Sequence, residues 1–187
     1  MKLIFAEILK ELKASGYKVS ARLLNAMYFN VPQSRQRMIF IGVREDLGKM
    51  PSYPGVQGIP FTVRCAILDL CNDKSDLKFN ENTRTAKIMR FVVPGKTDPK
   101  HHSHVKLSYD LPSRTLLKDF LGYFHFWHPI NHRPLTLKEW SRIGTFGDNF
   151  LFTDKKNGCQ RIGNSVPPLF MKAIAEHIRK EILDKIQ

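Results

Sequence analysis

Val31-Pro-Gln-Ser-Arg-Gln-Arg37 leads directly into the short apolar stretch at residues 38–43. The apolar stretch predicts a β-strand. Before the polar insert, Val19, Ala21 and Leu23 alternate with Ser and Arg, and this period of two predicts a second strand. The sequence therefore predicts two strands that flank a connection rich in glutamine and arginine.

A helix is predicted before the two strands. Five apolar side chains recur there at helical spacing: Ile4, Phe5, Ile8, Leu9 and Leu12. Gly16 follows where a helix cap is expected. An amphipathic helix followed by paired strands is typical of the edge of an α/β domain.

The rest of the chain is less regular until its final third. Residues 48–111 are rich in proline, histidine and basic residues, with one helix predicted at 62–70. Thr136-Leu-Lys-Glu139 has the spacing of a capping box, so a short helix is expected to follow. After Pro167-Pro168, apolar residues at helical spacing predict a long final helix.

Charge and composition narrow the class of protein. Thirty Lys and Arg against 17 Asp and Glu give a formal net charge of +13. Such an excess predicts a nucleic-acid partner, and a solvated basic surface is the alternative. No apolar run approaches a membrane span, and Glu7 and Glu11 interrupt any signal-peptide pattern, so we expect no membrane association and a cytoplasmic location. Three cysteines without metal spacing favour reduced thiols.

Three stretches follow one another in a fixed order: the insert at 31–37, Arg133-Pro-Leu-Thr-Leu-Lys-Glu139 and Gly163-Asn-Ser-Val-Pro-Pro168. Each alone is weak, because basic runs and Gly-Asn-Ser turns are common. Together, with Asp110-Leu-Pro-Ser-Arg-Thr115 and His128-Pro129 between them, they resemble the motifs of the DNA cytosine carbon-5 methyltransferases. The resemblance runs from about residue 9 to the end. It departs at residues 142–148, which lack the family's usual glutamine and proline.

The resemblance implies an α/β fold: the C-terminal portion of an S-adenosylmethionine-dependent, Rossmann-like methyltransferase with a small target-recognition region. It assigns residues 1–49 to the last strands and helix of the catalytic domain, 50–110 to a variable target-recognition region, and 111–187 to a closing segment with the final helix. It also implies methyl transfer from S-adenosylmethionine to carbon 5 of a flipped-out cytosine in double-stranded DNA. The expected setting is restriction–modification near a bacterial nucleoid.

The family resemblance suggests roles for the polar insert. It implies that Arg37 hydrogen-bonds the carbonyl oxygen of the target cytosine, while Gln33 and Arg35 support the pocket or contact DNA. A guanidinium is a fixed fork of donors that stays charged, which suits an oxygen that gains negative charge. The alternative is a surface turn whose arginines pair with nearby carboxylates.

A second set of residues concerns the methyl donor. Gly163, Asn164 and Ser165 are expected to form a tight turn into the final helix, where N–H groups can face a ligand carboxylate. The resemblance places this motif at the border of the S-adenosylmethionine site. Helix capping by Asn164 or Ser165 is the alternative, and both roles can hold together.

Other candidate residues have simpler interpretations. His101, His102 and His104 could suggest a metal, but adjacent histidines diverge and no acidic or thiol partner has ligand spacing, so no metal is expected. DNA contact or solvation is preferred for them. Arg133 and Glu139 are assigned to the capping-box structure. Three aromatic residues precede this segment: Phe124, Phe126 and Trp127. They could stack on bases, but a core role is preferred.

The sequence lacks two features of complete enzymes in this family, a Gly-x-Gly loop after an early strand and a Pro-Cys nucleophile. Cys65, Cys71 and Cys159 follow arginine, leucine and glycine. The chain alone is therefore expected to be inactive and to need an N-terminal methyltransferase half. A split enzyme, a truncated product and a fragment remain open. The alternative function is a non-catalytic DNA-binding module, and an RNA-binding module lacks its usual aromatic strand motif.

Overall fold

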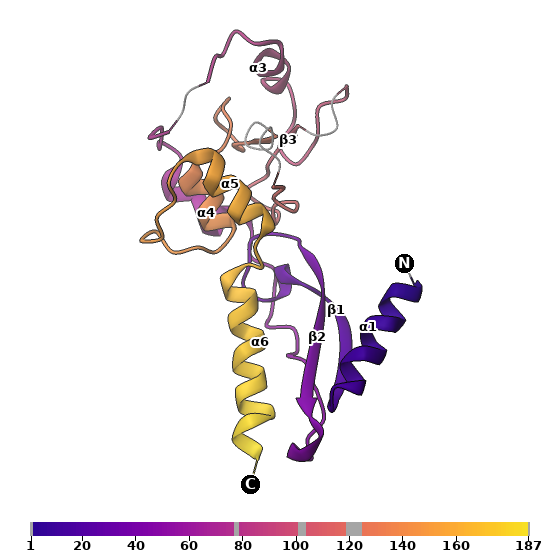
Figure 1. Cartoon of the computed structure of the whole chain (residues 1–187). Helices are drawn as coiled ribbons and strands as arrows, with labels where there is room; N and C mark the ends of the chain where they lie inside the picture. The colour runs from indigo at the N-terminus through magenta and orange to yellow at the C-terminus, as the bar shows by residue number, and fades with distance from the viewer. Residues whose placement is uncertain (1, 77–78, 101–103, 119–124, 187) are drawn as a thin grey trace. The chain divides into compact units, whose positions relative to one another are not determined.

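The computed structural model describes residues 2–76, 79–100, 104–118 and 125–186 (Figure 1). The chain divides into two compact units. Unit 1 comprises Met1–Asn25, Gln36–Val56 and Met171–Gln187, and unit 2 comprises Ala26–Arg35 and Gln57–Phe170. His101, His102 and Phe124 lie outside the described residues.

Unit 1 contains a β-hairpin, the helix that precedes it and most of the last long helix. Its elements are α1 (Lys2–Ala14), β1 (Tyr17–Asn25), β2 (Gln36–Arg44), the 3-10 helices η2 (Glu45–Leu47) and η5 (Leu183–Lys185), and α6 (Pro168–Glu181), whose first turn belongs to unit 2. Gly16 ends the first helix with a φ of 81°, a conformation that favours glycine. The predicted helix, strand pair and final helix are confirmed.

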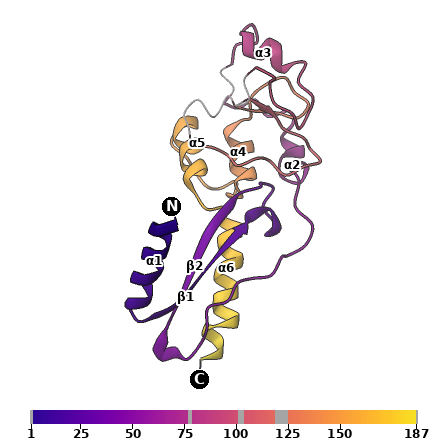
Figure 2. The ribbon, with the colours of Figure 1, turned by 90° about the vertical axis from the view of Figure 1, so that its right-hand side faces the viewer.

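The hairpin buries one of its two faces. β1 and β2 pair antiparallel from Tyr17↔Arg44 to Asn25↔Gln36. Leu24, Ile41 and Val43 share one face and are buried, as alternation along a strand dictates. Helix α6 runs alongside the hairpin in both views (Figures 1 and 2). Its apolar residues Ala173 and Ile174 are buried, as is Ile182 directly after it, so this helix and one hairpin face supply the core of unit 1.

Unit 2 consists of short elements joined by long irregular segments. They are η1 (Ala26–Tyr28), α2 (Val63–Ile67), η3 (Leu68–Leu70), α3 (Arg84–Met89), β3 (Val105–Lys106), β4 (Phe126–Trp127), α4 (Leu137–Ile143) and α5 (Lys155–Asn164). The helix expected at 62–70 is confirmed as α2 followed by η3. Strands β3 and β4 pair in parallel. Irregular backbone in this unit agrees with the proline-rich composition of residues 48–111.

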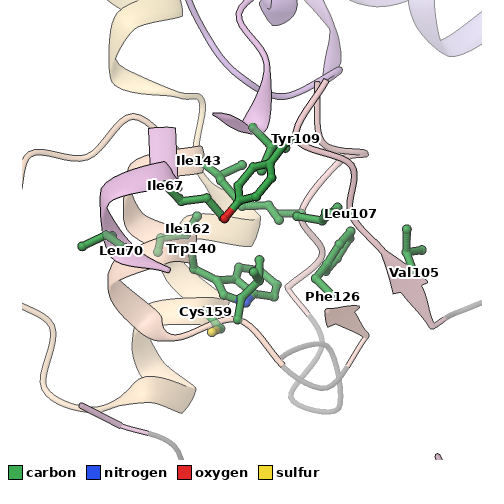
Figure 3. Close-up of a cluster of buried hydrophobic side chains, with 13 residues drawn as sticks. Ile67, Leu70, Val105, Leu107, Tyr109, Phe126, Trp140, Ile143, Cys159 and Ile162 are labelled. Atoms are coloured by element: carbon green, nitrogen blue, oxygen red, sulfur yellow. The ribbon is translucent and has the colours of Figure 1, made fainter. Parts of the chain in front are cut away.

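The core of unit 2 surrounds Trp140 on α4 (Figure 3). The Phe126 ring meets the Trp140 ring edge-on, with centroids 5.4 Å apart. Trp127, beside it in sequence, packs edge-on against Phe79 in a second, smaller cluster. Both aromatic residues of β4 are therefore buried, which confirms their preferred core role and removes them as base-stacking platforms.

The predicted capping box starts α4. The Thr136 hydroxyl accepts a hydrogen bond from the Glu139 N–H (3.2 Å), and the Glu139 carboxylate accepts one from the Thr136 N–H (2.7 Å). Arg133 donates to both carboxylate oxygens of Glu139 at 2.8 Å. All three residues are buried. Their assignment to structure is thus confirmed, because the three side chains form the capping box and a paired carboxylate inside the unit.

Helix α5 was not expected from the sequence. Asp154 caps it by accepting a hydrogen bond from the Asn157 N–H (2.8 Å). The helix contains Gly158 and Gly163, and glycine normally weakens a helix interior. A Cβ on Gly158 would overlap the Leu137 side chain, so this glycine permits close packing of α5 on α4.

The compact units do not follow the ranges 1–49, 50–110 and 111–187. Residues 111–170 fall in the same unit as residues 57–110, and the final helix returns to the unit of the hairpin. Those ranges were assigned by role, and their roles remain predictions. In the part of the chain that the structure describes, no helix is long and apolar enough to cross a membrane.

Candidate functional site

Two of the motifs lie side by side within unit 2. Gln33 forms a parallel bridge with Ser113. The Ser34 N–H donates to the Ser113 carbonyl (2.8 Å), and the Ser113 N–H donates to the Pro32 carbonyl (2.9 Å). The Thr115 hydroxyl donates to the Ser34 carbonyl at 2.8 Å. Residues 32–35 and 113–116, which are about 80 positions apart in the printed sequence, thus form one short ladder.

Arg35 joins this ladder to the third motif. Its Nη1 donates to the Leu116 carbonyl (3.0 Å) and its Nη2 to the Gly163 carbonyl (2.6 Å). The Gln33 side-chain oxygen accepts from the Leu116 N–H (3.2 Å) and lies 3.4 Å from Arg35 Nη1. We call these four residues the Arg35 junction. Charge-assisted bonds to two carbonyls make a guanidinium well suited to hold three backbone segments together.

Gly163 is fixed in the junction by the lack of a side chain. A Cβ at this position would overlap the backbone of Leu117 and Lys118. Backbone atoms cannot move away as the end of a flexible side chain can, so the close approach of the two segments requires glycine at this position. The same approach brings the Gly163 carbonyl within reach of Arg35. The glycine of the Gly-Asn-Ser motif therefore has a packing role.

The tight turn expected at Gly163, Asn164 and Ser165 is wrong. Gly163 and Asn164 are the last residues of α5, and Ser165 is its C-cap. The Ser165 N–H donates to the Arg161 and Ile162 carbonyls, and its hydroxyl donates to the Ile162 carbonyl at 2.8 Å. Ser165 therefore caps the end of α5, and not the start of the final helix as the capping alternative supposed. Its N–H is committed to the helix, whereas the exposed Asn164 side chain is available to a ligand.

Arg37 differs from Arg35 in every respect that matters for ligand binding. It lies near the start of β2 in unit 1, opposite Leu24. Its side chain is only partly buried, and its Nη1 donates to the Gln36 carbonyl at 2.7 Å. The remaining donors of a guanidinium can serve an external acceptor. This is the arginine of the motif that can still bind a ligand.

The structure separates the two roles offered for Gln33 and Arg35. Each is about 1% exposed, so neither side chain reaches the surface where a DNA backbone would run. Gln33 and Arg35 form hydrogen bonds with main-chain groups and with each other. The alternative of a surface turn whose arginines pair with carboxylates is therefore wrong for Arg35. Support of the pocket is the role consistent with this geometry.

His128 organises a turn that the sequence did not explain. The Ile130 and Asn131 N–H groups donate to its Nδ1 at 3.2 and 2.9 Å. Because Nδ1 accepts, the ring proton of the neutral form is on Nε2, which lies 3.2 Å from the Tyr109 hydroxyl. Burial, together with Arg133 and Lys106, lowers the pKa of His128 to about 3. The ring is thus neutral, and protonation would disrupt the turn.

The thiols do not form a reactive site. Burial raises the pKa of the Cys159 thiol to about 12, which disfavours the thiolate that attacks carbon. Cys65 is exposed, with its sulfur 3.7 Å from the Thr62 hydroxyl. Within the described ranges, no three His, Cys, Asp or Glu side chains gather as metal ligands.

A family model described as C-5 cytosine-specific DNA methylase matches residues 1–111 and 74–180. Among curated proteins, the chain is 33% identical to the type II methyltransferase M1.HphI of Haemophilus parahaemolyticus. That match covers 94% of this chain and 51% of the relative. The chain is also 29% identical to the type II methyltransferase M.BspRI of Lysinibacillus sphaericus, and that match covers 98% of this chain and 48% of the relative. The chain spans about half the length of these relatives and aligns to their C-terminal parts.

Solved structures agree on the fold. A prophage-encoded protein of E. coli, described as a DNA modification methyltransferase, matches with a TM-score of 0.74 at 20% identity, over 92% of this chain and 62% of that one. The Entamoeba histolytica methyltransferase EhMeth matches with a TM-score of 0.61 at 18% identity, and the match covers 99% of this chain and 59% of that one. The expected methyltransferase α/β fold is confirmed. On the match to nearly its whole length, the chain belongs to the C-5 cytosine-specific DNA methylase family.

Proposed function

We propose that this chain is the DNA-facing half of a cytosine carbon-5 methyltransferase that acts on double-stranded DNA in a restriction–modification system. The observation that carries the proposal is the Arg35 junction. It joins three motifs from distant parts of the sequence. Arg37 follows two residues later, and among the described residues only its Nη1 is bound, to the Gln36 carbonyl, so other guanidinium donors can bind a ligand. The net charge of +13 supports a polyanionic substrate.

The chemistry asks for such an arginine. A ring carbon inside the base stack cannot be attacked in place, so the cytosine must leave the duplex. Attack on the ring moves negative charge toward the carbonyl oxygen, and a fixed cation stabilises it there. We assign that cation to Arg37. Gln33 and Arg35 hold the chain that leads to it, and this positioning role needs no contact with DNA.

S-adenosylmethionine would supply the methyl group. From this chain, we propose the segment Gly163, Asn164 and Ser165 as one border of its site. The exposed Asn164 amide is the group best suited to contact the ligand, since Ser165 caps α5 and Gly163 serves the junction. The larger part of that site belongs to the half of the domain that this chain does not span.

The nucleophile would also come from that half. None of the three cysteines follows a proline, and the most buried one has a raised pKa. We therefore propose that residues 1–187 alone do not transfer methyl groups. They would act with a polypeptide that carries the methyl-donor loop and the Pro-Cys motif, encoded in the same or a neighbouring frame. We call that polypeptide the complementary half.

Arg37 offers a direct test. In a mixture of this chain and the complementary half, Arg37→Met should lower the rate of labelled methyl transfer to DNA by 100-fold or more, as is usual when one group that stabilises developing charge is lost, at about 10²–10³-fold. Arg22→Met is the matched control, since Arg22 is an exposed arginine on the partner strand β1. Equal activity of both variants would refute the role of Arg37.

A non-catalytic DNA-binding module is the second candidate, and the charge of the chain favours it. Such a module would bind DNA with a steep dependence on salt and without the methyl donor. It would show the same affinity with and without the complementary half. Methyl transfer that appears only in the mixture would exclude this candidate.

A further inference from the structure

Unit 1 carries an apolar surface that nothing in the described structure covers. It includes five side chains: Ile4, Ile8 and Leu12 on α1, Leu23 on β1 and Met38 on β2. We propose that this surface, called here the unit 1 apolar surface, binds the complementary half of the methyltransferase domain. The inference rests on the proposed function and adds to it the place where the two halves meet.

Helix α1 exposes the stripe that an amphipathic helix normally buries. Ile4, Ile8 and Leu12 recur every four residues and so lie on one face of the helix. Their exposed fractions are 62%, 43% and 38%. An apolar stripe directed toward water gives no stability to the helix. Its presence indicates a partner that removes it from water.

The hairpin repeats the pattern on one of its faces. Leu23 lies directly opposite Met38 in the antiparallel register, so the two side chains share a face. They are 55% and 45% exposed, whereas Ile41 and Val43 on the other face are 4% and 5% exposed. A strand pair that is apolar on both faces suits the interior of a layered α/β domain, where both faces are covered.

The exposure of apolar side chains on that face decreases along the hairpin. At the far end of the hairpin, the Tyr17 side chain lies against Gly42, within 3.4 Å of where a Cβ would stand. The aromatic ring therefore covers the backbone there. On the same face, Tyr17 and Phe40 are 39% and 37% exposed, so exposure is greatest at the end of the hairpin that carries Leu23 and Met38, next to the strand start at which Arg37 lies.

The size of the relatives indicates what covers this surface. The chain spans 51% and 48% of two curated relatives, and 62% and 59% of two solved structures with the same fold. A substantial part of the domain thus lies outside these residues. DNA is not expected to bind this surface, because all five side chains are apolar and DNA phosphates are bound mainly by Lys and Arg. A polypeptide with an apolar face is the fitting partner.

The experiment measures association of the full chain with the complementary half by isothermal titration, in parallel with methyl transfer by the mixture. The variant is Leu23→Lys with Met38→Lys. A second variant, Ile4→Lys with Ile8→Lys, tests the helix independently. The matched control is Ile59→Lys with Phe91→Lys, since these two apolar residues are 90% and 87% exposed in unit 2. Amide exchange in β1 and β2 verifies that the hairpin persists.

We expect each surface variant to raise the Kd for the complementary half by about 100-fold or more, because two anchoring side chains are each replaced by a charge. The control should bind as the wild type does. Wild-type affinity in both surface variants, with methyl transfer intact, would overturn the inference and leave the proposed function standing. No association and no methyl transfer by the wild-type mixture would overturn both. A stable dimer of this chain that the complementary half cannot displace would assign the surface to a second copy and overturn the inference.

Discussion

Both units expose single apolar side chains, such as Ile59 and Phe91 in unit 2, but unit 2 also encloses a large apolar core, whereas unit 1 exposes the apolar stripe of a helix and a cross-strand pair of its hairpin. Trp140 and the apolar residues labelled around it in Figure 3 are buried. Ile4, Leu23 and Met38 in unit 1 are about half exposed or more. The difference indicates a closed core in unit 2, and it agrees with the proposal that the unit 1 apolar surface binds the complementary half.

The same contrast holds between two arginines of one motif. Arg35 is fully buried and donates hydrogen bonds to main-chain carbonyls, whereas Arg37 is only partly buried and has further N–H donors. We therefore propose that the first of these arginines has a structural role and the second a binding role. Stability should depend on the first arginine, and catalysis on the second.

The largest effect should come from opening the core of unit 2. Trp140→Ala removes a fully buried indole that meets Phe126 edge-on. We expect a loss of about 3–5 kcal/mol in the free energy of unfolding, from lost transfer energy plus the cavity left behind. Urea denaturation followed by circular dichroism measures it. A loss below 1 kcal/mol would contradict the view of unit 2 as a self-contained core.

Replacement by methionine should lower the free energy of unfolding at Arg35 but not at Arg37. Arg35→Met leaves the Leu116 and Gly163 carbonyls without their donors, and we expect a loss of about 2–4 kcal/mol. Arg37→Met should change stability by less than about 0.5 kcal/mol, as at other partly exposed positions. Parallel urea titrations make the comparison. Equal losses for both variants would show that the arginines do not divide their roles.

His128 should make unit 2 sensitive to acid. Its folded pKa of about 3 lies below its ordinary value of 6.5, so below pH 6.5 the unfolded chain binds a proton that the folded chain does not. Stability from this group is present above pH 6.5 and declines as the pH falls toward 3. At pH 5 the decline should be about 2 kcal/mol.

A variant isolates this contribution from other titrating groups. His128→Asn keeps an acceptor for the Ile130 and Asn131 N–H groups but does not titrate. The difference in unfolding free energy between pH 7 and pH 5 should therefore be about 2 kcal/mol smaller in the variant. An unchanged difference would mean that His128 is protonated in the folded chain.

The smallest effect is expected on the unit 1 apolar surface. Met38→Ala removes a side chain that is 45% exposed in the chain alone. We expect the free energy of unfolding to change by less than about 0.5 kcal/mol. The measurement is the same urea titration. A loss of 2 kcal/mol or more would show that the side chain is buried by this chain itself and would remove the contrast between the units.

The local patterns of the sequence predicted much of this fold. The alternation in residues 19–23 and the run at 38–43 indicated both strands of the hairpin, and the spacing of Thr136 and Glu139 indicated the capping box. These signals are local, because each element is specified by neighbours within a few residues. The amphipathic first helix was also predicted, although its stripe is not buried as the pattern alone suggests.

The parts that were missed depend on distant partners. Helix α5 was hidden by Gly158 and Gly163, which weaken a helix but permit contacts with Leu137 and with the backbone of residues 117–118. The carbonyl partners of Arg35 lie 81 and 128 positions away. No spacing rule identifies them in a single sequence. The binding roles of the site residues therefore remain predictions, and the structure adds that Arg35 is buried while Arg37 is only partly buried.

The most direct test of the account is methyl transfer from labelled S-adenosylmethionine to double-stranded DNA by three samples: this chain, the complementary half, and their mixture. The account predicts transfer by the mixture alone, since the chain supplies Arg37 and the complementary half supplies the nucleophile. Transfer by residues 1–187 without a partner would contradict it, because a nucleophile would then have to be present among residues where no Pro-Cys occurs.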